Sequence, residues 1–322
     1  MTHQHDVVKD VALIDLKVTL WSGRVKLYAD DLNDRGLSDL VAHMPTDIVN
    51  LGSKRIFPGE SLRPFNSHKY HASKLLYEHG FQSFSAHIVP RSDVGDICRQ
   101  LDSIRDAFYQ DREALKSDYP ARLAAWANHV PEWRDVIMAA APSADTVYAK
   151  LGFDYRYILP ESSGAIGGSD PAQIGKSLID ELMSDVGADA QSIHEECLAG
   201  KARLHRRSLN RIASLQKKLE GFAFLDAYIV PKHISALANA LDNVPVQGVI
   251  GGKSLADISA AIDGIRQYDQ DSQSMPAHTS TRSGYDVSDD QETSARDPEP
   301  VATEPSDQND TAPADNQGMF AF

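Results

Sequence analysis

The chain has 322 residues, of which 42% are apolar and 24% charged, and its formal net charge is −14. This length allows one large domain or two modest ones, and the composition is that of an ordinary globular protein. Cys98 and Cys197 are too few and too far apart for a disulfide framework or a cysteine-based zinc site. The sequence lacks a signal-peptide pattern and an apolar run of the ~18 residues that a membrane span needs. We therefore expect a cytoplasmic protein without a membrane segment.

The negative charge is concentrated near the C-terminus. From Asp269 to Phe322 there are twelve acidic and two basic residues, which leaves only −4 of the −14 for the rest of the chain. This segment is rich in Ser, Thr, Asp, Gln and Pro, and such a composition cannot bury enough apolar surface to offset the entropy of ordering. We expect a flexible N-terminus over residues 1–10, a folded body over 11–268 and a disordered acidic tail over 269–322.

The first half of the body predicts strands alternating with helices. Period-two alternation and turn residues predict strands at 11–21, 24–28, 81–89 and 151–159, the second being a hairpin partner of the first. Helical patterns with their stop and cap residues occupy 37–43, 65–79, 93–117, 121–128 and 132–140.

The second half of the body is mostly helical. A helical pattern runs over 171–220 with an interruption near Gly187, a strand is predicted at 222–230, and helices follow at 234–241 and 254–268. A further short strand is expected at 246–250. The predicted fold class is therefore α+β, with long α-helices and a small sheet.

Two segments share a pattern at an offset of 141 residues. Residues 80–90 and 221–231 each read as a glycine stop, a strand that starts with phenylalanine and contains further aromatic residues, and a final Ile-Val-Pro. This pattern indicates a duplicated α–β–α unit, with two related halves at about 11–160 and 171–268. The alternative is coincidence, because glycine stops and Ile-Val-Pro strand ends are common.

Several segments resemble the domain-of-unknown-function family numbered 3150. They are Val18–Arg24, Leu51–Ile56, the strand ending in Ile88-Val89-Pro90, and the strand with Phe153-Asp154-Tyr155. The resemblance covers roughly residues 11–265. It implies a protein of phages, plasmids or integrative elements, often encoded beside a cobaltochelatase-like AAA+ ATPase and a von Willebrand-type protein. It assigns no catalytic residues.

Two patterns that can mark chemistry are incomplete here. Gly252-Lys253-Ser254 precedes a predicted helix, but a phosphate-binding loop would need its first glycine where Gln247 stands. His68 and His71 are spaced for one helix face, yet no third or fourth zinc ligand stands at helical spacing from both. We expect no catalytic residue, no metal, no cofactor and no small-molecule site.

A basic helix over residues 201–218 is the strongest candidate for binding. At about 100° per residue, its cations lie on one face and its leucines on the other. The cationic residues are Arg203, Arg206, Arg207, Arg211, Lys217 and Lys218. Such a face binds nucleic acid, binds an acidic protein surface, or pairs with carboxylates of a neighbouring helix.

The chain ends in an apolar motif whose anchors are Met319, Phe320 and Phe322. On an acidic, flexible segment, these side chains suit capture by a partner protein. We expect a non-catalytic accessory or adaptor protein of a phage or mobile element, and the family resemblance suggests an AAA+ ATPase as its partner. The alternative is a nucleic-acid-binding protein of replication or recombination that uses the basic helix.

Overall fold

The computed structural model of the protein describes residues 7–28, 31, 52–161 and 171–273. All of them belong to one compact unit, Met1–His278. The helix predicted at 37–43 and nearly all of the predicted disordered tail lie outside the described residues. The predicted class is confirmed, because long helices accompany small antiparallel sheets, which makes the fold α+β.

Four strands form the main sheet in the order β4-β5-β1-β6. The strands are β1 (Val11–Thr19), β4 (Phe81–Ser83), β5 (Ala86–Pro90) and β6 (Gly152–Ile158). Both edges of β1 are paired in antiparallel register, and Leu13 lies opposite Ile88 on one side and Ile158 on the other. The predicted hairpin between the first two strands is therefore wrong. Instead β2 (Arg24–Lys26) pairs with β3 (Ser53–Arg55) in a separate sheet.

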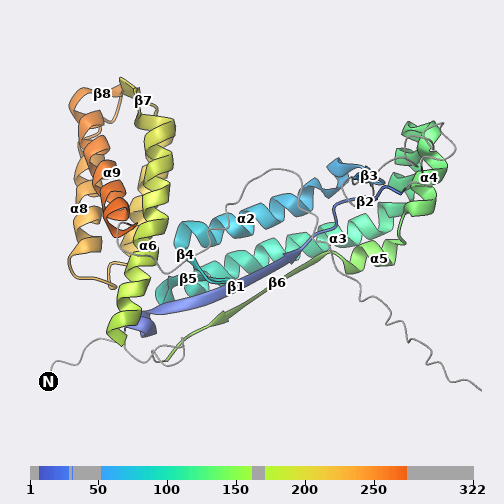
Figure 1. The fold of residues 1–322 in the computed structure, drawn as a ribbon, viewed down its shortest axis with the longest axis horizontal. Coiled ribbons are helices and arrows are strands. Elements are labelled where there is room, and N and C mark those ends of the chain that lie inside the picture. Colours follow the sequence, from blue (N-terminus) through green and yellow to red (C-terminus); the bar gives the residue numbers. More distant parts are fainter. Residues whose placement is uncertain (1–6, 29–30, 32–51, 162–170, 274–322) are drawn as a thin grey trace, which may run out of the picture. The chain divides into compact units, whose positions relative to one another are not determined.

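Helices α2 (Arg63–His79) and α3 (Val94–His129) lie along one face of this sheet (Figure 1). Ala12 and Ile14 of β1 and Phe153 of β6 pack there in one hydrophobic cluster with side chains of both helices. The remaining helical elements of this region are short. They are η1 (Val7–Asp10), η3 (Gly59–Leu62), η4 (Arg91–Asp93), η5 (Pro131–Trp133), α4 (Arg134–Ala140) and α5 (Ala144–Ala149).

Three boundaries in this region differ from the prediction. The body begins before Val11, because η1 already buries Val8. The strand predicted at 81–89 is a hairpin, with Phe84 and Ser85 forming the two-residue connection between β4 and β5. The helices predicted at 93–117 and 121–128 are one helix, α3, which continues through Pro120.

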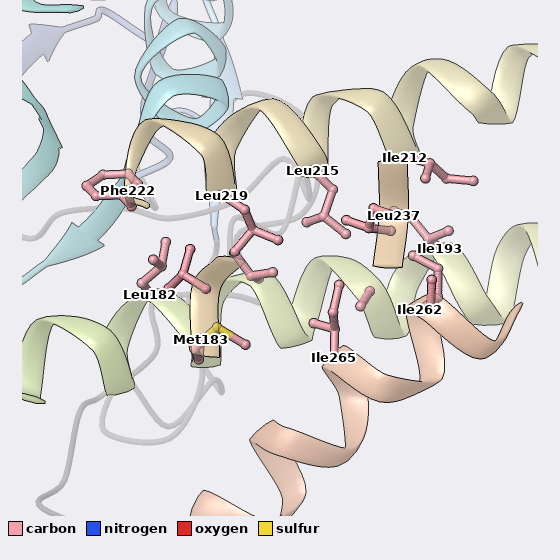
Figure 2. Close-up of a cluster of buried hydrophobic side chains, with 14 of the residues drawn as sticks. Leu182, Met183, Ile193, Ile212, Leu215, Leu219, Phe222, Leu237, Ile262 and Ile265 are labelled. Carbon is pink, nitrogen blue, oxygen red and sulfur yellow. The ribbon is translucent and has the colours of Figure 1, made fainter. Parts of the chain in front are cut away.

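Four helices form a bundle over residues 171–273. They are α6 (Pro171–Ile193), α7 (Arg206–Gly221), α8 (Ile229–Asp242) and α9 (Gly252–Gln273). Each helix packs on the next, and α9 returns to α6. Figure 2 shows their side chains converging on one core, among them Leu182, Leu219, Leu237 and Ile262. A π-helical turn, η7 (His194–Leu198), follows α6, and α9 extends five residues past the predicted end of the body at Tyr268.

The other face of the sheet joins the core of the bundle. Val11, Phe81 and Ile88 belong to the same hydrophobic cluster as the bundle helices. The ring of Phe81 lies 5.2 Å from the ring of Phe222, which follows α7. Part of the sheet is thus buried on both faces.

The strand predicted at 222–230 is wrong, and with it the second copy of the α–β–α unit. The Asp226 side chain accepts hydrogen bonds from the backbone N–H groups of Tyr228 and Ile229, which starts α8 there. Pro231 then lies in the first helical turn, where its missing N–H costs nothing. Pro90 instead ends a strand. The same Ile-Val-Pro sequence therefore ends a strand in one segment and begins a helix in the other. The two segments are not copies of one structural unit.

Strand β6 is an edge of the main sheet, and one end of that edge is closed by a side chain. The hydroxyl of Tyr109 on α3 donates to the carbonyl of Phe153 at 2.8 Å and accepts from its N–H at 3.4 Å. These backbone groups point away from β1 and would otherwise be open to an incoming strand.

Replacing Pro120 by Ala should stabilise the protein by about 1–3 kcal/mol, because it restores a helical N–H and removes a steric clash inside α3. Pro120 is exposed, so its truncation leaves no cavity. Urea unfolding measures the effect. The matched control is Pro64→Ala in the first turn of α2, where proline is favoured and no gain is expected. Equal changes in the two variants would contradict this account of Pro120.

Candidate functional site on helix α7

The six cations of the predicted basic helix do not form one outward face. Arg203 lies in a short strand, β7 (Arg203–Leu204), and α7 begins only at Arg206. Lys218 is buried, with 3% of its surface exposed. The other cations are exposed, namely Arg203, Arg206, Arg207, Arg211 and Lys217. The prediction that Lys218 faces outward is therefore wrong.

Lys218 is the centre of a polar joint between α7, α6 and α2. Its ammonium pairs with Asp185 and lies 3.6 Å from Asp189 Oδ2, both on α6. It also lies 3.9 Å from the ring centroid of Tyr77 on α2, and the Tyr77 hydroxyl donates to Asp189. Burial raises the pKa of Asp189, and the ammonium of Lys218 opposes that rise. The buried cation is thus satisfied by two carboxylates and an aromatic face.

His87 of β5 lies beside this joint. It is 8% exposed, and its Nδ1 has no hydrogen-bond partner within the part of the chain that the structure describes. Burial lowers the pKa of His87, the carboxylate of Asp185 raises it, and the ammonium of Lys218 lowers it. The imidazole is therefore held neutral next to a charged pair.

Arg211 is exposed, but its side chain also contacts the end of α6 and the turn η7 that follows it. Its guanidinium donates to Glu196 Oε2 at 2.6 Å and to Ser192 Oγ at 2.9 Å, and it lies 3.9 Å from Cys197 Sγ. The hydrogen bond from Ser192 and the charge of Arg211 lower the pKa of Glu196. Glu196 belongs to the π-helical turn, a distortion frequent at functional sites. Two of the six cations are thus paired with the neighbouring helix.

The remaining four cations lie at the surface. Arg206 donates to the carbonyl of Pro245 at 2.6 Å. For Arg203, Arg207 and Lys217, no side-chain ion pair or hydrogen bond occurs within the described ranges. The tail motif of Met319, Phe320 and Phe322 lies outside the described residues.

Sequence reasoning missed the partners of α7. Asp185, Asp189 and Ser192 on α6 and Glu196 in the following turn η7 continue one helical spacing, and they face Lys218 and Arg211, which are seven residues apart on α7. That spacing is a usable signal for two antiparallel helices, because residues three and four apart share a face. Tyr77 and His87 come from distant segments and carry no such signal.

A hollow beside α3 is small. It is lined by Arg112, Tyr119, Tyr148 and Leu151 among others, and these side chains leave essentially no space that a water-sized molecule could occupy. Pockets that hold metabolite-sized ligands have roughly 300–1,000 Å³. Among the residues the structure describes, no group of three or more His, Cys, Asp or Glu side chains is arranged to hold a metal ion. None of the described helices is both long and apolar enough to cross a membrane.

One family model matches most of the chain. A family model described as "Protein of unknown function (DUF3150)" matches residues 8–266. The chain belongs to this family. The match covers the sheet, both of its helices and nearly the whole bundle, so the joint around Lys218 lies inside the DUF3150 region. No curated protein and no solved structure matches the DUF3150 chain.

Replacing Lys218 by Met should destabilise the protein by about 2–4 kcal/mol, because two partly buried carboxylates lose their cation. Urea unfolding measures the loss. The matched control is the neighbouring Lys217→Met, which removes the same charge at an exposed position and should cost no more than about 0.5 kcal/mol. If both variants lost the same unfolding free energy, the contacts of Lys218 with Asp185, Asp189 and Tyr77 would add no stability beyond that of any surface lysine.

The stability of the protein should fall as the pH drops below about 6.5. The folded-state pKa values of His87 and His233 are both lowered by burial, so the unfolded chain binds protons first. The stabilisation is complete above the unfolded pKa and is lost as the pH falls towards the folded values. Unfolding free energies between pH 8 and 5 measure this loss, and His87→Gln should reduce the slope. An unchanged slope would exclude His87 as a contributor.

Proposed function

We propose that this chain is a non-catalytic accessory or adaptor protein of a phage or mobile element, and that its partner is an AAA+ ATPase encoded beside it. The single observation that carries the adaptor role is the tip of the β4–β5 hairpin. The ATPase and the mobile element come from the family resemblance. A cytoplasmic location accords with Cys98 and Cys197, which are both free thiols.

Phe84 at this tip is 95% exposed, and its backbone has a positive φ of 53°. A bulky residue in the left-handed region costs about 1–2 kcal/mol, and glycine or asparagine normally stands in such turns. An exposed aromatic side chain gains nothing in the isolated protein that would offset this strain. Strain of this kind is typical of functional positions, and aromatic side chains are the commonest anchors of protein interfaces.

The nucleic-acid alternative is weaker in its original form. The sequence predicts six outward cations on the basic helix over 201–218, but Lys218 pairs with Asp185 of α6 and Arg211 pairs with Glu196 of η7. The exposed cations that remain lie mainly at the start of α7 and just before it.

Replacing Phe84 by Gly should uncouple stability from function. We expect the free energy of unfolding to rise by about 1 kcal/mol, because glycine accepts the positive φ. Affinity for the AAA+ ATPase encoded beside a family member should fall by ten-fold or more, the effect of losing an aromatic anchor of about 2 kcal/mol. Isothermal titration calorimetry measures the affinity.

The control is Tyr228→Ser, which removes another aromatic side chain that is 75% exposed and should leave the affinity unchanged. If Phe84→Gly binds as tightly as the wild type, the hairpin tip is not the contact. If the wild-type chain does not bind the ATPase, the proposed partner is wrong.

A further inference from the structure

A small antiparallel pairing brings two basic segments together at one end of the bundle. Strand β7 pairs with β8 (Ile250–Gly251), and Arg203 lies directly opposite Gly251. Helix α7 begins two residues after β7, and α9 begins directly after β8. Figure 1 shows β7 and β8 at the same end of the helices. Residues about fifty positions apart in the sequence thus become neighbours.

This pairing gathers a group of exposed cations that we term the basic cap. Its members are Lys201, Arg203, Arg206, Arg207 and Lys253. At no more than about 3.5 Å per residue, each lies within roughly 15 Å of chain from the β7–β8 pair. Lys253 does not belong to a phosphate-binding loop. In the structure it lies close in the chain to Gly251, which is paired with Arg203.

The basic cap carries an excess of positive charge. Neither residues 199–219 nor residues 243–256 contain an aspartate or a glutamate. Lys253 shares a 2.8 Å ion pair with Asp257, but its side chain stays 81% exposed. Arg206 contacts the Pro245 carbonyl, a neutral partner that leaves its charge uncompensated. Unlike Arg211 and Lys218, these cations are not drawn into the α6–α7 contact.

We propose that the basic cap is a second binding surface of this protein and that it binds the sugar–phosphate backbone of a nucleic acid. Three of its five cations are arginines, whose planar forks bind phosphate oxygens in a bidentate manner. Four of these cations lie in the strand β7 or at the starts of α7 and α9, and Lys201 lies just before β7, an arrangement that suits a row of phosphates. Phosphate contacts carry no sequence information, so we expect this binding to show no base-sequence preference. This activity does not depend on the adaptor role.

An anionic membrane is the competing ligand. Val246 and Val249, between α8 and β8, are 89% and 59% exposed and lie in the loop that Arg206 contacts. Interfacial membrane binding uses larger apolar side chains such as Trp, Phe and Leu on an amphipathic helix. Two valines on a loop offer too little apolar area for membrane insertion. The three arginines suit phosphate oxygens, and we therefore favour nucleic acid as the ligand.

The test compares the full chain with the variant Arg203→Gln/Arg207→Gln/Lys253→Gln. Fluorescence anisotropy with labelled single-stranded and duplex DNA of about 30 nucleotides is recorded from about 50 to 200 mM KCl. Wild-type affinity should fall steeply with salt. The triple variant should bind at least ten-fold more weakly at the lowest salt, and the slope of log affinity against log salt should shrink by roughly two to three.

The matched control is Lys69→Gln/Arg134→Gln/Lys150→Gln, which removes the same charge from exposed positions of the sheet-and-helix region and should behave as the wild type. Thermal unfolding verifies that all variants fold. The proposal is overturned if the wild type shows no salt-sensitive binding or if both triple variants lose affinity equally. Binding to phosphatidylserine–phosphatidylcholine vesicles but not to DNA would also overturn it.

Discussion

Strand β1 contributes to both hydrophobic cores of the described structure, because its first side chains alternate between the two faces of the sheet. Val11 packs with the bundle, whereas Ala12 and Ile14 pack with α2 and α3. Because the side-chain period of a strand is two, a slip of one residue would exchange the two sets. The pairings with β5 and with β6 each fix the register of β1. Each pairing therefore also determines which β1 side chains pack on either face of the sheet.

The sequence predicted those elements whose determinants are local. The alternation of Phe153 and Tyr155, the helix before Gly80 and the long helical runs all appear where the pattern placed them. The errors came where distant packing decides. Pro120 stays inside a helix because Tyr119 and Leu123 are buried beside it. Ile-Val-Pro ends a strand at residue 90 but lies in the first turn of a helix at residue 231, since only there does a preceding carboxylate, that of Asp226, accept hydrogen bonds from the backbone N–H groups that start the helix.

The candidate site shows the same division. The helical pattern places Lys218 and Arg211 with the other cations on the face opposite the leucines, but it cannot say which residues of a neighbouring helix lie across from them. The structure supplies the acidic row of α6 as the neighbour, and burial of Lys218 follows. The basic cap could not be predicted from the sequence either, because Arg203 and Lys253 are about fifty residues apart and are brought together by the pairing of β7 with β8. The sequence therefore identifies the cations, but only the packing of the helices and strands shows which carboxylates or other cations lie beside each one.

The Tyr109 hydroxyl that closes the backbone of Phe153 also has a bearing on solubility. With those groups taken, only the outward backbone groups of Tyr155 and Tyr157 remain on that edge of β6, because alternate residues face β1. Segments that recruit further chains into fibrils need about six residues of open strand. The Tyr109 hydroxyl, a little before the middle of α3, thus limits the growth of the sheet at high protein concentration, and β6 itself contains neither of the usual edge guards, lysine and proline.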